Sequence, residues 1–180
     1  MRGAEAVLIP EEFLGEGMLR KDRIRKSYRI KELDERLRRE RTRREARLLH
    51  KAKLAGVSAP VVYEVTEYTI LITRIKGRRL SEKPAELREA GRMLAKLHDA
   101  GIIHGDFTPY NIIVNREGLH AIDFGLGFFS HKIEDKAVDL ITMLKALKKK
   151  GEFLRGYRRS KNYPQLMNKV KEIEKRARYQ

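Results

Sequence analysis

The sequence predicts an α+β fold of two small lobes, a β-rich N-lobe with one long helix and a small helical C-lobe. Two observations predict it. Strand-like runs on both sides of a long charged segment fill residues 1–75, whereas helical periodicity dominates residues 76–180 around a single hairpin signal. With 180 residues, 41% of them hydrophobic, the chain is long enough to bury a core as one ordinary domain or as two small lobes. We expect the lobes over residues 1–75 and 76–180.

The N-lobe is expected to begin with two short strands and the long helix. The strands are predicted over residues 4–9 and 17–24, separated by the turn residues Pro10 and Gly15. The helix is predicted over residues 30–55, where a mostly polar segment carries one apolar stripe.

Two β-branched runs close the N-lobe, and an amphipathic helix opens the C-lobe. Residues 60–65 and 68–75 are expected to pair as a hairpin that ends at Lys76 and Gly77. Residues 86–100 carry apolar side chains at helical spacing.

The rest of the C-lobe is predicted to hold one tight hairpin and two helices. The apolar runs 112–114 and 119–122 flank an Asn-Arg-Glu-Gly turn, which is a strong hairpin signal. Helices are predicted over residues 135–150 and 163–178, and the second is very basic.

The charge balance is the most unusual property of the composition. The chain carries 41 Lys and Arg against 25 acidic residues, a formal net charge of +16 at pH 7. A surplus of this size is typical of proteins with a polyanionic partner, such as nucleic acid, a membrane surface or an acidic protein. A charge-rich surface of the thermophile kind is the alternative, although balanced charge would suit that interpretation better.

The absence of cysteine excludes disulfides and thiolate metal sites, and it favours a reducing intracellular location. No stretch approaches the ~20 apolar residues that a membrane helix needs, and no charged-then-apolar leader opens the chain. We therefore expect a cytoplasmic protein without a membrane partner.

Two motifs around the predicted C-lobe hairpin carry the chemistry. They are His104-Gly105-Asp106-Phe107-Thr108-Pro109-Tyr110-Asn111 and Asp123-Phe124-Gly125. They resemble the catalytic loop and the magnesium motif of protein kinases, so the two lobes are expected to form a minimal protein-kinase-like fold. Phosphoryl transfer needs a carboxylate at the attacking oxygen and oxygen ligands for the Mg²⁺ that bridges the phosphates. We assign Asp106 to the first task and Asn111 and Asp123 to the metal, with ATP and Mg²⁺ as cofactors.

A purely structural interpretation of these residues is also available. Asp106 would cap a turn and Asn111 would start the hairpin, because Asp and Asn do both routinely. The order of the two motifs and the hairpin that joins them favour the catalytic interpretation. His104 is expected to brace the loop backbone rather than to move protons.

A kinase also needs a strand lysine paired with a helix glutamate to hold the α and β phosphates. Lys21 lies on the strand before the long helix and is our candidate. Glu40 and Glu45 are its possible partners, and Glu45 should face inward because it lies beside the apolar stripe. The alternative is an ordinary surface lysine and a solvated glutamate, since the segment is crowded with both types.

The nucleotide cover is abbreviated in this chain. No G-x-G-x-x-G segment lies near its start, and only Gly3-Ala4-Glu5-Ala6 occupies that place. Considered alone, this tetrapeptide is equally consistent with a frayed N-terminal strand.

Four segments carry a more specific resemblance. They are Gly3-Ala4-Glu5-Ala6, Lys21-Asp22-Arg23-Ile24-Arg25-Lys26-Ser27-Tyr28-Arg29, Glu40-Arg41-Thr42-Arg43-Arg44-Glu45-Ala46 and His104-Gly105-Asp106-Phe107-Thr108. Together they resemble the small kinase subunit of the KEOPS complex, the PRPK-like family of atypical serine/threonine kinases, over nearly the whole chain. The resemblance implies that Gly3, Ala4, Glu5 and Ala6 form an abbreviated phosphate loop and that Lys21 and Glu45 form the ion pair.

The same resemblance implies partners and a function. The implied partners are the threonylcarbamoyl-transferase subunit of KEOPS, its accessory subunits, and tRNA that decodes ANN codons. In that family ATP hydrolysis supports the threonylcarbamoyladenosine modification of tRNA, and serine/threonine autophosphorylation also occurs. The expected activity is therefore that of a Ser/Thr protein kinase and ATPase.

Two departures from ordinary protein kinases agree with an unusual acceptor. Only residues 126–133 separate Gly125 from the next predicted helix, too few for an activation segment that docks peptides. Gly105 replaces the arginine that usually reads a phosphorylated activation loop. Our hypothesis is an enzyme that is always assembled, with turnover set by partner binding and with water or a nearby side chain as acceptor.

The end of the chain is strongly basic. Residues 145–180 hold thirteen Lys or Arg against three acidic residues. We expect tRNA to lie near this C-terminal helix through counterion release. A solvated helix face is the alternative.

Two other functions stay open at this point. One is a different enzyme of the same fold, either a stand-alone RIO-type serine kinase or a small-molecule phosphotransferase. Antibiotic kinases share an H-G-D loop, but they need a helical insertion that this chain lacks. The other is a nucleotide-binding pseudokinase that acts as a scaffold for RNA. The presence of all the side chains that phosphoryl transfer requires argues against this alternative.

Overall fold

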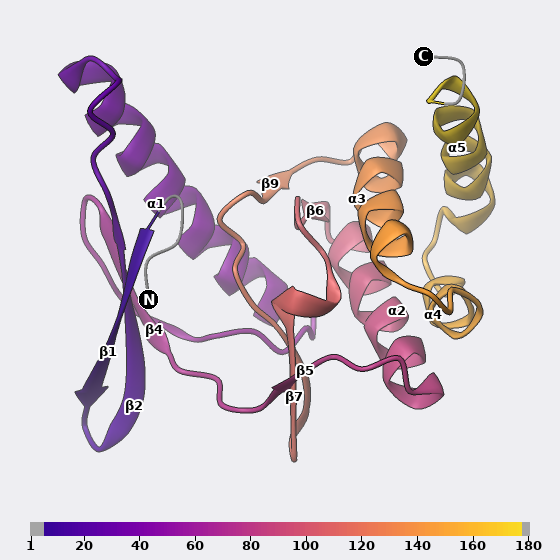
Figure 1. The fold of residues 1–180 in the computed structure, drawn as a ribbon, viewed down its shortest axis with the longest axis horizontal. Helices are drawn as coiled ribbons and strands as arrows, with labels where there is room; N and C mark the ends of the chain where they lie inside the picture. Colours follow the sequence, from indigo (N-terminus) through magenta and orange to yellow (C-terminus); the bar gives the residue numbers. More distant parts are fainter. Residues whose placement is uncertain (1–5, 178–180) are drawn as a thin grey trace.

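The computed structural model describes residues 6–177, and it places a strand-rich lobe beside a helical one (Figure 1). The N-lobe is one antiparallel sheet in the order β1-β2-β4-β3 with a single long helix. Its elements are β1 (Ala6–Phe13), β2 (Glu16–Arg23), α1 (Lys31–Leu54), β3 (Val62–Val65) and β4 (Thr69–Thr73). Leu48 and Leu49 of the predicted apolar stripe of α1 are buried, and so is Ala52 one turn further on.

The first turn differs from the prediction. Pro10 does not end the first strand but lies inside β1, opposite Leu19 of β2. The reason is position in the sheet, because β1 is an edge strand and an edge tolerates a residue that has no amide hydrogen to donate. The chain turns at Leu14 and at Gly15, the other predicted turn residue, which have φ values of 53° and 78°.

The C-lobe contains four helices in the described part of the chain and two small sheets. The helices are α2 (Pro84–Asp99), α3 (Ile133–Ala146), α4 (Gly151–Tyr157) and α5 (Tyr163–Arg176). One sheet joins β5 (Arg78–Arg79), β7 (Ile112–Asn115) and β8 (Gly118–Ala121), and a two-stranded sheet joins β6 (Ile102–Ile103) to β9 (Phe128–Phe129). A single 3₁₀ turn, η1 (Pro109–Asn111), precedes the predicted hairpin.

The predicted helix over residues 135–150 is wrong at its end. Helix α3 stops at Ala146, and α4 begins separately at Gly151. Glu82 gives the physical reason, since its carboxylate accepts the backbone amides of Lys148 and Lys149 at 3.1 and 2.8 Å. These amides are therefore satisfied without helical hydrogen bonds.

Two glycines allow α4 to pack directly on α2. A Cβ atom at Gly91 would lie 2.0 Å from the Phe153 carbonyl oxygen, and one at Gly156 would lie 1.9 Å from the Arg88 carbonyl oxygen. The two helix backbones thus approach more closely than any side chain permits, and the buried Tyr157 reaches the centre of the C-lobe.

The hydrophobic core is continuous between the lobes. Leu48 and Leu49 of α1 belong to the same buried cluster as Leu94 of α2 and Phe124 of the Asp-Phe-Gly motif. Residues 74–77 connect the two lobes, and we propose that the boundary lies there, after residue 75. Among residues 6–177, no helix is both long and apolar enough to cross a bilayer.

Candidate active site

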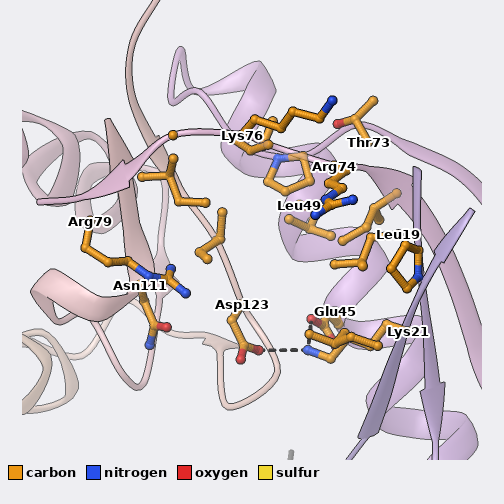
Figure 2. A pocket seen from close by; sticks show the side chains of 18 residues that line it. Leu19, Lys21, Glu45, Leu49, Thr73, Arg74, Lys76, Arg79, Asn111 and Asp123 are labelled. Atoms are coloured by element: carbon orange, nitrogen blue, oxygen red, sulfur yellow. Dashed lines mark hydrogen bonds and ion pairs between the residues drawn. The ribbon is translucent and has the colours of Figure 1, made fainter. Parts of the chain in front are cut away.

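A cavity of about 520 Å³ lies between the lobes (Figure 2). Apolar side chains line it from both sides, among them Leu8, Leu19, Leu49, Ile72, Ile113 and Ile122. Its polar lining includes Lys21 and Glu45 from the N-lobe and Asn111 and Asp123 from the C-lobe. The structure thus brings four of the predicted site residues to one cavity.

Lys21 connects the two lobes. Its Nζ donates to Glu45 Oε1 and to Asp123 Oδ1, each at 2.7 Å. Burial by itself would lower the pKa of Lys21, but the charges of Glu45 and Asp123 more than reverse that effect and raise the pKa above its ordinary value. Lys21 therefore stays a cation in the cavity.

The local folding of β2 and α1 explains this pairing. Lys21 and Arg23 lie two residues apart on one strand, so both face α1. Glu45 lies on the buried stripe of α1, and its Oε2 accepts from Arg23 while its Oε1 accepts from Lys21. Glu40 is exposed, which leaves Glu45 as the partner of Lys21.

Asp123 has an unusual backbone conformation for a non-glycine residue. Its φ is 60°, in the left-handed region that such residues rarely adopt. Its Oδ1 accepts from Lys21 and, at 3.3 Å, from the Gly125 amide. Burial would raise the pKa of Asp123, but the Lys21 charge and hydrogen bond bring it below its usual value, so this carboxylate stays ionised.

The loop over residues 104–111 folds back on itself at its two ends. Asn111 Nδ2 donates to the Asp106 carbonyl oxygen at 2.8 Å and to Asp106 Oδ2 at 2.7 Å. These bonds fix the side chains of Asp106 and Asn111 relative to each other. Both side chains are half-buried, so they are held and still accessible.

A buried carboxylate that the sequence analysis did not identify anchors this loop. Asp139 of α3 accepts the backbone amides of His104 and Gly105 at 2.8 and 3.0 Å. His98 Nε2 donates to the same carboxylate at 3.1 Å, and His98 Nδ1 contacts the Tyr157 hydroxyl at 2.6 Å. Burial would raise the pKa of Asp139, but the hydrogen bonds from His98 and the loop lower it.

A sequence signal for Asp139 existed. It is a lone acidic residue between Ala137 and Leu140 on the apolar face of α3, and a carboxylate there must be paired when the helix packs.

His104 braces the loop, as predicted. It is fully buried, its Nε2 donates to the Ile122 carbonyl oxygen at 3.1 Å, and its Nδ1 accepts the Asp106 amide at 3.3 Å. Acceptance of the Asp106 amide by Nδ1 needs the neutral imidazole, and burial lowers the pKa of His104 accordingly. The ring packs against Phe107 and Phe124.

The backbone conformation at residue 105 and its close packing both require glycine. Its φ is +81°, and a Cβ atom there would lie 2.5 Å from the Leu126 carbonyl oxygen. The chain after Gly125 runs close against the loop of residues 104–111 at this point, and β9 then pairs with β6 before α3 begins at Ile133. The segment is as short as the sequence indicates.

The oxygen atoms of the site suit Mg²⁺. Asn111 uses its amide nitrogen for Asp106, and Asp123 uses Oδ1 for Lys21 and Gly125. Within residues 6–177, Asn111 Oδ1 and Asp123 Oδ2 accept no hydrogen bond. Two such oxygens match the few protein ligands that Mg²⁺ takes when phosphates and water supply the others. In the same residues there is no cluster of three His, Cys, Asp or Glu that would hold a metal alone.

The remaining predicted site residues lie at the start of the chain. Gly3, Ala4 and Glu5 lie outside the described residues. Ala6 is the first residue of β1 and is buried.

Comparison with protein families defines the class of this chain. The RIO domain model matches residues 16–132, more than half of the sequence. The chain therefore belongs to the RIO domain family. A solved Rio2 kinase–ADP/Mg²⁺–phosphoaspartate complex from Chaetomium thermophilum matches with a TM-score of 0.66 at 15% identity, over 100% of this chain and 70% of that one. At that identity the likeness concerns the fold alone, and it confirms the predicted bilobal kinase-like architecture.

Two relatives with much higher sequence identity define the family of this chain more closely than the solved structure does. The probable serine/threonine-protein kinase BUD32 homolog of Archaeoglobus fulgidus is 42% identical over 174 residues, covering 91% of this chain and 89% of the relative. The KEOPS complex subunit Bud32 of Pyrococcus abyssi is 41% identical over 182 residues, covering 88% of this chain and 83% of the relative. These relatives confirm the resemblance to the small kinase subunit of KEOPS.

A third relative is much longer. It is the probable bifunctional tRNA threonylcarbamoyladenosine biosynthesis protein of Methanosarcina barkeri, 37% identical over 189 residues. The match covers 98% of this chain and 35% of the relative, so the chain spans about a third of that protein.

Proposed function

We propose that the chain is a Mg-ATP-dependent phosphotransferase and ATPase that acts in the KEOPS complex and supports the threonylcarbamoyladenosine modification of tRNA. The observation that carries the catalytic part is the convergence of Lys21, Asn111 and Asp123 on one cavity between the lobes. The names of the relatives, which cite a protein kinase, KEOPS and tRNA threonylcarbamoyladenosine, support the cellular part.

Each polar group of the cavity has a role in this proposal. Lys21, held by Glu45, binds the α and β phosphates, and Asn111 and Asp123 supply oxygen ligands to Mg²⁺. The metal, when bound, neutralises charge on the transferring phosphate. Asp106 accepts the proton of the attacking hydroxyl or water, and its hydrogen bond from Asn111 keeps it beside the metal ligands.

The apolar walls of the cavity provide a place for a base. Leu8 and Leu19 come from the sheet of the N-lobe, and Ile113 and Ile122 come from the C-lobe hairpin. A flat purine between such walls is held by dispersion and by burial of its faces. Gly3, Ala4, Glu5 and Ala6 are proposed to cover the phosphates from the N-lobe side.

The segment after Gly125 suggests the phosphoryl acceptor, and the relatives suggest the partners. The short chain after Gly125 provides no platform for an extended peptide, so water or a nearby side chain is the proposed acceptor. The proposed partners are the threonylcarbamoyl-transferase subunit of KEOPS, its accessory subunits and tRNA, in the cytoplasm. The longer bifunctional relative is consistent with a transferase that works beside this domain.

An ATPase assay tests the proposal. Phosphate release by the purified chain is measured with and without the transferase subunit and tRNA. Asp123→Ala is expected to lower magnesium-dependent turnover at least 100-fold, because it removes a metal ligand and a partner of Lys21. Asp22→Ala is the matched control, since Asp22 is an exposed neighbour of Lys21 that does not line the cavity. Equal turnover in the two variants would refute the proposed site.

The same assay separates an enzyme from a scaffold. Asp106→Ala is expected to abolish both ATP turnover and support of tRNA modification by the reconstituted complex. Full support of modification by this variant would favour the pseudokinase scaffold instead.

A further inference from the structure

Six exposed basic side chains lie in two stretches of the chain that the Glu82 carboxylate joins, and we call this group the basic edge. Its members are Lys76, Arg79, Lys83, Lys148, Lys149 and Lys150. Lys76 lies in the segment that connects the lobes, Arg79 and Lys83 follow it, and the other three lie between α3 and α4. The two stretches are about 70 residues apart in sequence, so only the fold brings them together.

Glu82 holds the two stretches side by side. Its Oε1 accepts the Lys148 amide at 3.1 Å, and its Oε2 accepts the Lys149 amide at 2.8 Å. Both contacts are to the backbone, so neither lysine ammonium group is used in them. Gly77 fixes the other end, because a Cβ atom there would lie 2.4 Å from the Val114 carbonyl oxygen and the chain therefore packs directly on β7.

The protein offsets only part of the charge of the basic edge, because the Glu82 carboxylate attracts the charges of Lys148 and Lys149. No member of the basic edge forms an ion pair with a carboxylate in residues 6–177. The acidic residues nearby are already engaged: Glu86 pairs with Arg78, and Glu152 pairs with Arg88 and Arg155. Glu82 uses both of its oxygens on the amides that it accepts.

Helix α5, which the sequence suggested as the RNA contact, differs in this respect. Between Tyr163 and Arg176 it has four basic residues, of which Lys169 and Arg176 pair with Glu172. The basic edge thus offers more unpaired charge than the described part of this helix.

The basic edge also lacks the apolar surface that a protein partner would use. None of the exposed large hydrophobic residues lies within residues 74–86 or 145–152. Protein interfaces have a core depleted in charge and enriched in aromatic side chains, whereas surfaces that follow a phosphate backbone are basic and polar.

We infer that the basic edge binds the phosphate backbone of RNA. The choice of RNA rests on the proposed role in tRNA modification, and the excess of positive charge, with no ion pair to any of the six side chains in residues 6–177, supports a polyanion independently of that role. Binding is driven by the release of counterions from the phosphates and is therefore steeply dependent on salt and independent of base sequence. Figure 2 shows Arg79 reaching toward Asn111, so the edge begins at the border of the nucleotide cavity.

The test measures the affinity of an unmodified tRNA transcript for the full chain at several salt concentrations. The variant Lys148→Gln, Lys149→Gln, Lys150→Gln removes three charges, and it leaves the backbone amides free to donate to Glu82. We expect binding at 0.15 M salt to weaken by about tenfold or more. The slope of log K against log salt should fall by about 2 to 3, corresponding to three lost phosphate contacts.

The control is a second triple variant with the same net charge as the Lys148–Lys150 variant. Arg43→Gln, Arg47→Gln, Lys51→Gln removes three exposed basic side chains from one outward face of α1, none of which forms an ion pair in the described structure. This variant is expected to change the affinity by less than about threefold, through long-range electrostatics alone. An equal loss in both variants, or an unchanged salt slope in the first, would overturn the inference.

Two further measurements keep the inference separate from the proposed function. ATP turnover without RNA should be unchanged in the Lys148–Lys150 variant, since these residues do not line the cavity. Asp123→Ala should bind tRNA as tightly as the unmodified chain. If Asp123→Ala retained its turnover, the proposed catalytic site would fail while the RNA surface stood. Loss of binding to the transferase subunit with tRNA affinity intact would assign the edge to an acidic protein and refute RNA.

Discussion

Each lobe uses a buried carboxylate to hold a segment of the candidate site, and the two lobes do this differently. Glu45 in the N-lobe and Asp139 in the C-lobe are each only 2% exposed. Glu45 accepts from two charged side chains, Lys21 and Arg23, whereas Asp139 accepts from two backbone amides and His98. The N-lobe therefore fixes a side chain through charge, and the C-lobe fixes a backbone loop through hydrogen bonds.

The difference determines which half of the site can respond to ligand. Lys21 also bonds Asp123, whose side chain is 57% exposed, so the N-lobe arrangement reaches water and depends on the approach of the two lobes. The Asp139 arrangement is enclosed and joins elements of one lobe only. We therefore expect the loop that carries Asp106 to keep its shape during turnover, while Lys21 exchanges partners as phosphates and metal bind.

Removal of the C-lobe anchor should have the largest effect. Asp139→Ala leaves the amides of His104 and Gly105 and the His98 ring without their buried acceptor, at a cost of about 3–5 kcal/mol of unfolding free energy. Urea denaturation measures this cost. Asp139→Asn keeps an acceptor of the same size and should lose less. A loss below about 1 kcal/mol for Asp139→Ala would show that the loop does not depend on this anchor.

Loss of the Glu45 charge in the N-lobe should reduce the unfolding free energy less than Asp139→Ala does. It should also lower activity directly. Glu45→Gln keeps the shape but leaves Lys21 and Arg23 without a buried counter-charge, for about 2–3 kcal/mol of unfolding free energy. Because Lys21 loses its position, we expect kcat/KM for ATP to fall about 100-fold.

Glu40→Gln is the matched control for this variant, since it makes the same change on the exposed face of α1. Its stability and activity should stay within error of the unmodified chain. If Glu45→Gln and Glu40→Gln had the same stability and activity, the pairing of Lys21 with Glu45 would not contribute to function.

This comparison also separates what sequence reasoning could predict from what it could not. Glu45 was predictable, because the apolar stripe of α1 indicates which of two glutamates faces inward. The convergence of Asn111 and Asp123 was predictable, because one short hairpin joins their motifs. These features depend on local periodicity and on the short distance along the chain between the residues concerned.

The missed features depend on distant partners. Asp139 lies on an apolar helix face, which signals a buried partner but does not identify the loop about 35 residues earlier. The end of α3 depends on Glu82, about 66 residues before the amides that it accepts. The position of Pro10 inside a strand depends on strand order, and the sequence does not show that β1 is an edge strand. Such pairings become visible only when the elements are packed.

The smallest predicted effect concerns pH and tests the enclosed character of the C-lobe. His104 is buried as the neutral imidazole with a lowered pKa, whereas in the unfolded chain it titrates near its ordinary value of about 6.5. Below that pH the unfolded state binds more of the extra proton than the folded state does, so stability falls as the pH decreases. The loss per pH unit below about 6 should not exceed ~1.4 kcal/mol.

Unfolding free energies between pH 7.5 and 5 measure this slope. His104→Gln should remove the corresponding part of it, whereas His120→Gln, on the C-lobe hairpin and less enclosed, should remove less. The outcome decides between two arrangements of the loop. A slope that survives in His104→Gln means that water reaches the ring in the folded state. The loop would then be held by Asp139 alone, and the contrast between an enclosed C-lobe anchor and an accessible N-lobe anchor would no longer stand.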